Sequence, residues 1–249
     1  MRTLPRLLTP RSALFLDFDG TLAELAPRPD AVVVPRELIA VLDQLQTQLD
    51  GAVAVITGRA QADIEPFLAP LRLPAAYEHG AVRHPAHGAP VRAPTPDLDA
   101  PLAAARTLVA QYPGLLLEHK QTAMALHFRL APELESTCTA AMAAAIAHDP
   151  GLQLLRGKAV VEVKSAHVSK GLAIAAFMAE APFAGREPIF AGDDVTDEAG
   201  FEVVQRLGGT GVKVGEGPSC AVLRVPDPVA LRAWLLQAAR LPLRPETPA

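Results

Sequence analysis

Two aspartates separated by a single residue are the strongest chemical signal in this chain of 249 residues. Asp17 and Asp19 belong to the run Asp-Phe-Asp-Gly-Thr, which directly follows the apolar residues 13–16. In extended backbone the two side chains point to the same side, so a cation must offset their repulsion or one pKa must rise. Carboxylate oxygens suit a hard divalent ion such as Mg²⁺. The alternative is an acidic turn that only caps the following segment.

Two more segments carry groups that suit a phosphate. Thr57, Gly58 and Arg59 follow the apolar residues 53–56, where a hydroxyl and the backbone N–H groups of a predicted helix start can hold phosphoryl oxygens. Lys170 stands at the head of another predicted helix and supplies a fixed positive charge. A lysine alone is more often a solvated surface residue, so a functional role for Lys170 is inferred only because the other motifs are also present.

Three aspartates follow the apolar residues 188–191 within five positions: Asp193, Asp194 and Asp197. Asp193 lies nearest to the end of the predicted strand, which makes it the natural metal ligand of the three. Open α/β sheets bind their ligands outside the carboxyl ends of their strands. We therefore expect this run and the Asp17 motif to belong to one site.

The elements around these motifs alternate between strand and helix. Residues 13–16 and 53–56 are short apolar runs typical of strands buried on both faces, and the helix between them begins after Pro35. The same rhythm returns in a helix at 170–180, a strand at 188–191, a helix at 198–205 and a strand at 212–214. This order predicts an α/β fold with parallel strands and right-handed crossovers.

The middle of the chain has a different pattern. After a proline-rich stretch at residues 85–101, period-two alternation predicts strands at 115–118, 123–129, 152–156 and 160–164, with helices at 102–111 and 132–148. We interpret residues 97–167 as an inserted α+β cap domain. Residues 1–96 and 168–249 then form the core domain.

Composition excludes several classes of partner. The formal net charge of −4 offers no long-range attraction for nucleic acid or an anionic membrane. No run approaches the roughly 20 apolar residues that cross a bilayer, and the arginines near the start precede too short an apolar stretch for an export signal. The two cysteines, Cys138 and Cys220, fit a reducing compartment better than a disulfide framework. We expect a cytoplasmic protein that binds neither nucleic acid nor membrane.

In their order and spacing these motifs resemble those of the haloacid dehalogenase-like phosphatases, and the likeness extends over residues 13–235. Within that superfamily, the run from Gly192 to Glu198, the run from Glu78 to Ala81 and the charged patterns of the cap look like the trehalose-6-phosphate phosphatases. The resemblance implies a Rossmann-like parallel core with an inserted α+β cap. It also implies Mg²⁺-dependent hydrolysis of a small-molecule sugar phosphate, trehalose 6-phosphate, in trehalose biosynthesis.

The resemblance also implies roles for the acidic residues. Asp17 becomes a transient aspartyl-phosphate, and Asp19 acts as general acid and then general base, so it must be neutral when the substrate arrives. Mg²⁺ is held by the Asp17 carboxylate, the Asp19 backbone carbonyl and Asp193. Asp194 and Asp197 support the site through a bound water or by orienting the lysine, with a helix N-cap as the alternative for Asp197.

Alternation in the cap strands places apolar residues on one face and charged residues on the other. By the resemblance, Glu118, Lys120 and Glu162 contact the sugar ring remote from the phosphate, whereas a solvated sheet face is the alternative. His127 and Arg129 share the charged face without an assigned role.

Other functions stay open at this point. The substrate can be another sugar phosphate, such as sucrose phosphate or a mannosyl-phosphoglycerate, and phosphoryl transfer between sugar positions is a further alternative. An inactive sugar-phosphate sensor is a third, although the retention of all four motifs argues against it. His79 belongs either to a tight turn or to the approach to the sugar.

Overall fold

The computed structural model describes residues 7–25, 32–119, 122–157 and 159–240. The chain divides into two compact units, a larger unit of Met1–Arg92 with Ser169–Ala249 and a smaller unit of Ala93–Val168. The insertion predicted from the sequence, 97–167, thus begins four residues later and ends one residue earlier than the smaller unit.

The larger unit is built on one sheet with the strand order β12-β11-β10-β1-β2-β3-β4-β5. The pairings from β12 to β3 are parallel, as predicted, and β4 and β5 extend the sheet in antiparallel fashion. The strands are β1 (Ser12–Leu16), β2 (Val53–Ile56), β3 (Ala75–Tyr77), β4 (Val82–His84), β5 (Val91–Arg92), β10 (Glu187–Gly192), β11 (Thr210–Val214) and β12 (Leu223–Val225).

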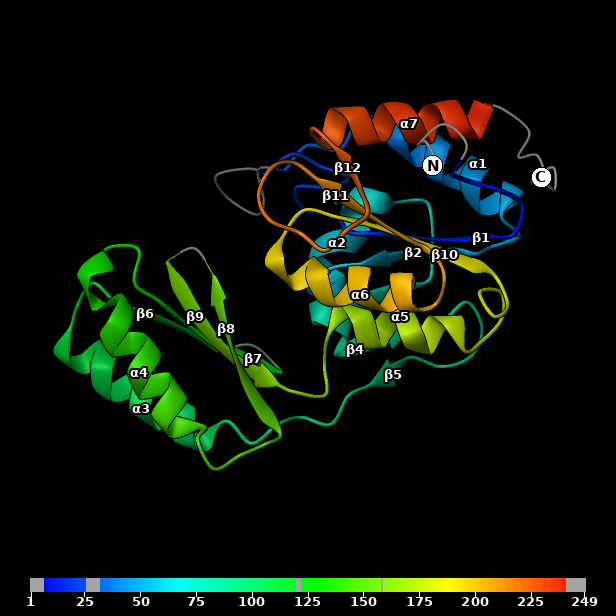
Figure 1. Cartoon of the computed structure of the whole chain (residues 1–249). Helices are drawn as coiled ribbons and strands as arrows, with labels where there is room; N and C mark the ends of the chain where they lie inside the picture. Colours follow the sequence, from blue (N-terminus) through cyan, green and yellow to red (C-terminus); the bar gives the residue numbers. More distant parts are fainter. Residues whose placement is uncertain (1–6, 26–31, 120–121, 158, 241–249) are drawn as a thin grey trace. The chain divides into compact units, whose positions relative to one another are not determined.

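Helices cover both faces of this sheet: α1 and α7 lie on one side, α5 and α6 on the other (Figure 1). The first helix begins after Pro35 and buries Leu38, Leu42 and Leu45, whose spacing places them on one stripe. The helical segments are α1 (Arg36–Gln48), α2 (Gln61–Leu68), α5 (Lys170–Met178), α6 (Glu198–Arg206), α7 (Pro228–Arg240) and the 3₁₀ turns η3 (Glu78–Gly80) and η5 (Val195–Asp197).

The core of the larger unit explains why β1 is central. All five residues of β1 are buried, as expected for a strand covered on both faces. Phe15 stacks on Phe183 at a ring-centroid distance of 5.2 Å, and Phe177 of α5 completes this aromatic group. The strand that ends at Leu16 is therefore held on both sides before the chain reaches Asp17.

The smaller unit has an antiparallel sheet of order β6-β7-β9-β8, with α3 and α4 packed against one face. Met124 and Leu126 of β7 join Cys138 and Met142 of α4 in its core, so the predicted apolar face is confirmed. The elements are α3 (Asp99–Gln111), β6 (Leu116–His119), β7 (Ala123–His127), η4 (Pro132–Leu134), α4 (Glu135–Ala145), β8 (Leu152–Gly157) and β9 (Val160–Ser165).

Two boundaries in the smaller unit differ from prediction. The strand predicted at 123–129 ends at His127, and the chain turns directly after it, where the Ala131 N–H donates to the Phe128 carbonyl. The helix predicted at 132–148 is a 3₁₀ turn followed by α4, which ends at Ala145.

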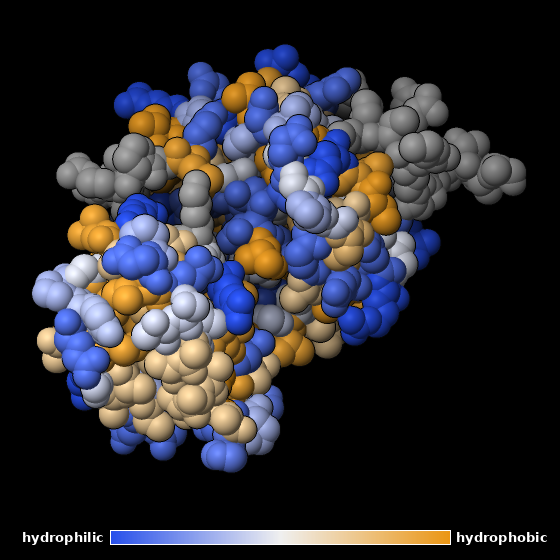
Figure 2. Space-filling view, turned by 60° about the vertical axis from the view of Figure 1, so that its left-hand side comes forward, coloured by the Kyte–Doolittle hydropathy of each residue, from blue (hydrophilic) through white to orange (hydrophobic). Residues whose placement is uncertain are grey.

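The surface seen in Figure 2 carries hydrophilic and hydrophobic residues side by side. Within the described ranges, no helix combines the length and the apolar character needed to cross a membrane.

Candidate active site

The carboxyl ends of β1 and β10 bring two of the predicted motifs together. These strands are parallel neighbours, with Leu16 opposite Ala191, and the Asp17 N–H donates to the Ala191 carbonyl at 2.9 Å. Asp17 and Asp193 therefore leave the sheet at the same edge, as the strand-end argument predicted.

Lys170 lies between two buried carboxylates. Its Nζ donates to Asp17 Oδ1 at 2.7 Å and to Asp197 Oδ1 at 2.6 Å. The three side chains are between 0% and 5% exposed. A buried ammonium requires such partners, because its desolvation is otherwise very costly. The lysine that sequence alone left as a surface residue or a ligand is thus part of the site.

Burial and charge shift the protonation of this cluster. Burial raises the pKa of Asp17 well above its ordinary value, and the positive charge of Lys170 opposes that rise without cancelling it. Burial lowers the pKa of Lys170, but the two carboxylates outweigh burial and raise it overall. The proton therefore stays on Lys170, and an additional cation favours ionised Asp17.

A metal ion has a suitable set of oxygen donors here. One carboxylate oxygen from each of Asp17, Asp193 and Asp197 lies within 4.8 Å of the others. Burial, together with Asp197 and Asp194, raises the pKa of Asp193 to about 6. A hard divalent cation such as Mg²⁺ fits this donor set, because it binds oxygen ligands and offsets their mutual repulsion.

A glycine leaves room for Asp193. Gly20 has a φ of +76°, and a Cβ at this position would lie 2.1 Å from Asp193 Oδ2. The Thr21 hydroxyl approaches the other oxygen of Asp193 at 3.5 Å. The glycine of the Asp17 motif therefore lets two strand-end loops approach each other closely.

Asp197 and Asp194 have separable structural roles. Both oxygens of Asp197 are engaged, since Oδ1 accepts from Lys170 and Oδ2 accepts from the N–H groups of Asp193 and Asp194 at 2.9 Å. Asp194 is the N-cap of η5, and Asp197 completes its capping box. Asp197 also occupies the N-cap position of α6, but its side chain makes no cap hydrogen bond there and accepts from Lys170 instead.

Arg59 binds Asp19, a contact that the sequence did not reveal. Arg59 Nε donates to Asp19 Oδ2 at 2.6 Å, and Nη2 donates to Oδ1 at 2.7 Å. The hydrogen bond that Arg59 donates to Asp19 is the main cause of a raised pKa for Arg59, so Arg59 keeps its positive charge. Both oxygens of Asp19, the predicted general acid and base, therefore already accept from Arg59.

The loop after β2 differs in part from the expectation. Thr57 to Arg59 precede α2 rather than starting it, because the N-cap of that helix is Ala60. The Thr57 N–H donates to the Ala76 carbonyl, and the Arg59 N–H donates to Thr57 Oγ1 at 3.1 Å. Within the described part of the chain the Gly58 N–H has no recorded acceptor, so Gly58 offers the donor that the other two residues do not.

Lys213 is a second buried cation that the sequence analysis missed. It lies on β11 opposite Gly192, is 5% exposed, and donates through Nζ to the carbonyls of Asp193 and Val214. Its positive charge partly opposes the rise that burial and the neighbouring aspartates cause in the pKa of Asp193. The available signal was a lysine between two valines in a strand otherwise free of charge.

In the smaller unit, Glu118 and Glu162 lie in one row across the sheet, because each is paired with Ala125 of β7. Paired residues of adjacent strands point to the same face, so the two carboxylates share a face as predicted. His127 Nε2 lies 2.9 Å from Glu118 Oε2. Lys120, the third residue assigned to the sugar, lies outside the described residues.

His79 and Arg129, which have no assigned role, both lie in described parts of the chain. Glu78 and His79 both have positive φ values, 48° and 58°, which supports the tight-turn interpretation of His79. A Cβ on Gly58 would lie 2.5 Å from the His79 ring, so this ring lies against the loop after β2. Arg129 is exposed and lies beyond the end of β7.

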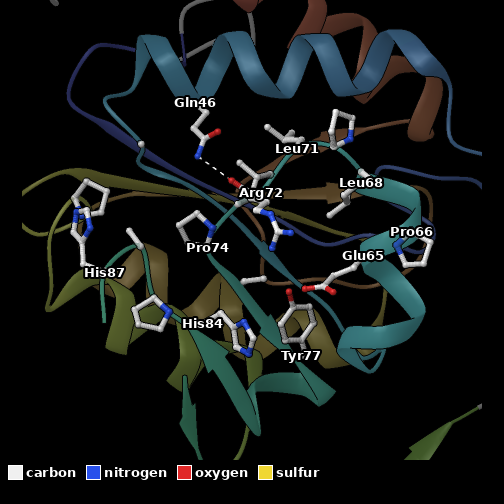
Figure 3. Close-up of a pocket in the computed structure, with 18 of the residues that line it drawn as sticks. Gln46, Glu65, Pro66, Leu68, Leu71, Arg72, Pro74, Tyr77, His84 and His87 are labelled. Atoms are coloured by element: carbon white, nitrogen blue, oxygen red, sulfur yellow. Dashed lines mark hydrogen bonds between the residues drawn. The ribbon is translucent and has the colours of Figure 1, made fainter. Parts of the chain in front are cut away.

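A pocket of about 710 Å³ opens elsewhere on the larger unit (Figure 3). Tyr77, Arg72 and Glu65 face this space, and the loop between α2 and β3 forms one wall. Gly51 and Pro74 also line it, and they stand before the amino ends of β2 and β3. The pocket therefore lies at the sheet edge opposite Asp17 and does not belong to the candidate active site.

Comparisons with known proteins agree with this geometry. The family model described as trehalose-phosphatase matches residues 15–222. The trehalose-6-phosphate phosphatase of Escherichia coli (strain K12) is 45% identical over 230 residues, covering 92% of this chain and 86% of that protein.

Solved structures share the fold. The C-terminal domain of the C. albicans trehalose-6-phosphate phosphatase has a TM-score of 0.81 at 21% identity and covers 94% of each chain. A haloacid dehalogenase-like hydrolase from B. subtilis has a TM-score of 0.67 at 17% identity, covering 92% of this chain and 100% of that one. The predicted haloacid dehalogenase-like α/β fold is thus confirmed.

Proposed function

Since the chain belongs to the trehalose-phosphatase family, we propose that it hydrolyses trehalose 6-phosphate to trehalose and phosphate through an aspartyl-phosphate. The observation that carries the proposal is the likeness of almost the entire chain to a trehalose-6-phosphate phosphatase. The contact between Lys170 and Asp17 supports the chemistry, because it places a fixed cation beside a carboxylate at the ligand-binding edge of the sheet.

Asp17 is the nucleophile of this proposal. Lys170 occupies Asp17 Oδ1, and within the described residues Oδ2 accepts no hydrogen bond, which leaves it available for attack. Oδ2 forms a bond to phosphorus while the bond from phosphorus to the sugar oxygen breaks. Lys170 and the Gly58 N–H offset charge on the phosphoryl oxygens, and Thr57 shapes the loop that presents this donor.

Asp19 is the general acid and general base of this proposal. It gives a proton to the departing sugar oxygen in the first step and takes one from the attacking water in the second. The second step releases phosphate and restores the Asp17 carboxylate. The two carboxylates thus have different partners in this proposal, phosphorus for Asp17 and the departing sugar oxygen for Asp19.

The metal site of the proposal consists of Asp17, the Asp19 backbone carbonyl and Asp193. Asp197 is given a supporting role in this proposal, because Lys170 and two backbone N–H groups donate to its two oxygens. Mg²⁺ bound there would neutralise charge on the phosphoryl group and keep Asp17 ionised. Asp194 supports the site from outside by capping η5.

The charged face of the smaller unit supplies specificity. Glu118 and Glu162 share that face, and Lys120 belongs to the same predicted set. Carboxylates and an ammonium group suit sugar hydroxyls, which both donate and accept hydrogen bonds. His127 keeps Glu118 oriented through the contact at 2.9 Å.

Phosphate release from a panel of sugar phosphates, with and without Mg²⁺, tests this function. We expect Mg²⁺-dependent turnover with a clear preference for trehalose 6-phosphate over sucrose phosphate, mannosyl-phosphoglycerate and glucose 6-phosphate. Equal turnover of all four would refute the substrate assignment. Asp17→Asn, which keeps the volume of the side chain, should abolish turnover without unfolding the protein, and undiminished hydrolysis would exclude the covalent route.

A further inference from the structure

The Asp19–Arg59 pair is built more firmly than a surface ion pair. Two parallel contacts join the guanidinium to both carboxylate oxygens, and the Arg59 side chain is 12% exposed. Such bidentate contacts impose a direction on the carboxylate as well as a charge. Surface pairs with one flexible contact impose neither.

The guanidinium is itself held in place. Its central carbon lies 5.6 Å from the ring centroid of Phe18 and 5.4 Å from that of Phe67. Phe18 stands between the two aspartates, and Phe67 belongs to α2, so the arginine joins the two loops that carry the candidate chemistry. These rings fix Arg59 independently of its contact with Asp19.

The backbone of Arg59 is also fixed from two sides. Its N–H donates to Thr57 Oγ1 at 3.1 Å, and its carbonyl accepts from the Glu78 N–H at 2.9 Å. Arg59 therefore forms a rigid support, whereas the Asp19 side chain is 32% exposed and depends on that support for its direction.

From this arrangement we infer that Arg59 is the positioning residue of the general acid and base, Asp19, in an inference that rests on the proposed function. A proton on one Asp19 oxygen weakens the contact of that oxygen with Arg59, and the other contact keeps the carboxyl in place. When the proton passes to the sugar oxygen as its bond to phosphorus breaks, the carboxylate regains both donors. Arg59 thus favours the transition state over the bound substrate.

Leaving groups of different basicity test this inference. A sugar alkoxide needs a proton to depart, whereas 4-nitrophenolate and acetate depart without one. We expect Arg59→Met to lower kcat/KM for trehalose 6-phosphate by about 10- to 100-fold, with kcat/KM for 4-nitrophenyl phosphate and acetyl phosphate changed by less than about threefold. The ratio kcat/KM is compared because it reports formation of the aspartyl-phosphate and not its hydrolysis, in which Asp19 acts as the base for all three substrates. Arg59→Lys, which keeps the charge but cannot form two parallel contacts, should recover only part of the loss.

A matched arginine provides the control. Arg83 also lies over an aromatic ring, 5.0 Å from the centroid of Phe177, and pairs with Glu180. This cluster makes no recorded contact with the acidic cluster in the described part of the chain, so Arg83→Met should alter stability and leave the ratio of the three substrate rates unchanged.

The outcomes separate this inference from the proposed function. An equal loss with all three substrates in Arg59→Met means a merely structural role and overturns the inference. If Asp19→Asn is selective for the sugar phosphate while Arg59→Met is not, only the inference fails. If Asp19→Asn also lowers all three rates equally, the acid and base role of Asp19 fails, and the role of Arg59 fails with it.

Discussion

Replacing Lys170 by Met tests how strongly the buried cluster depends on its cation. Lys170 is 3% exposed, and the side chains of its partners Asp17 and Asp197 are 5% and 0% exposed. The values for surface ion pairs, about 0–1 kcal/mol, therefore do not apply. Removing one partner of a buried pair costs about 3–5 kcal/mol, because the remaining charge stays buried without compensation.

A loss of that size is a large fraction of the 5–15 kcal/mol by which domains are typically stable. Urea denaturation at pH 7 without divalent cations measures it. The added substitution Asp197→Asn removes one of the two uncompensated carboxylates and should restore part of the stability but no activity. A loss below about 1 kcal/mol in Lys170→Met would refute the reasoning, since it would place the cluster among surface pairs.

Three further perturbations probe the site. Gly20→Ala should displace the Asp193 carboxylate, abolish turnover and destabilise the fold by more than the control Gly185→Ala. Gly185 has a similar φ of +75° but open space where the Cβ would lie, so its substitution should cost only about 1–2 kcal/mol. Equal urea midpoints for the two variants would contradict this prediction. Because the pKa of Asp193 rises from 3.8 to about 6 on folding, the folded state retains a proton between these values, so the stability of the metal-free protein should fall as pH rises through this window. Saturating Mg²⁺ should remove that slope in urea titrations, and a slope that Mg²⁺ leaves unchanged would argue against Asp193 as a ligand. Glu162→Gln should raise KM for trehalose 6-phosphate by about tenfold, because the lost binding free energy is about that of one hydrogen bond. Hydrolysis of 4-nitrophenyl phosphate should not change, and an equal change for both substrates would exclude a sugar contact.

The central part of the fold could be predicted because its signals are local and strong. The run at β1 is apolar throughout, and the leucines of α1 repeat at helical spacing, so the strand, the helix and β2 follow from the printed residues. By contrast, β4 and β5 are three and two residues long, and both residues of β5 are exposed. Such short strands depend on pairing with a neighbour rather than on their own pattern.

The site could be predicted to the level of strand ends and no further. Parallel pairing fixes where β1 and β10 end, so the meeting of Asp17 and Asp193 follows from topology. The contact of Arg59 with Asp19 depends on side-chain rotamers and on two aromatic rings from different segments, which spacing cannot show. Nor could the contacts of Asp194 and Asp197 be told apart without knowing that Asp197 is buried.

The two hydrophobic clusters described above share no residue within the described ranges. Phe15 belongs to the cluster of the larger unit, and Met124 belongs to that of the smaller one. Substitutions at sites without shared partners combine almost additively in stability. The charged face that carries Glu118 and Glu162 can therefore accumulate mutations while the packing beneath Asp17 is preserved. This separation makes the chain a modular starting point for laboratory evolution of phosphatases with new sugar preferences.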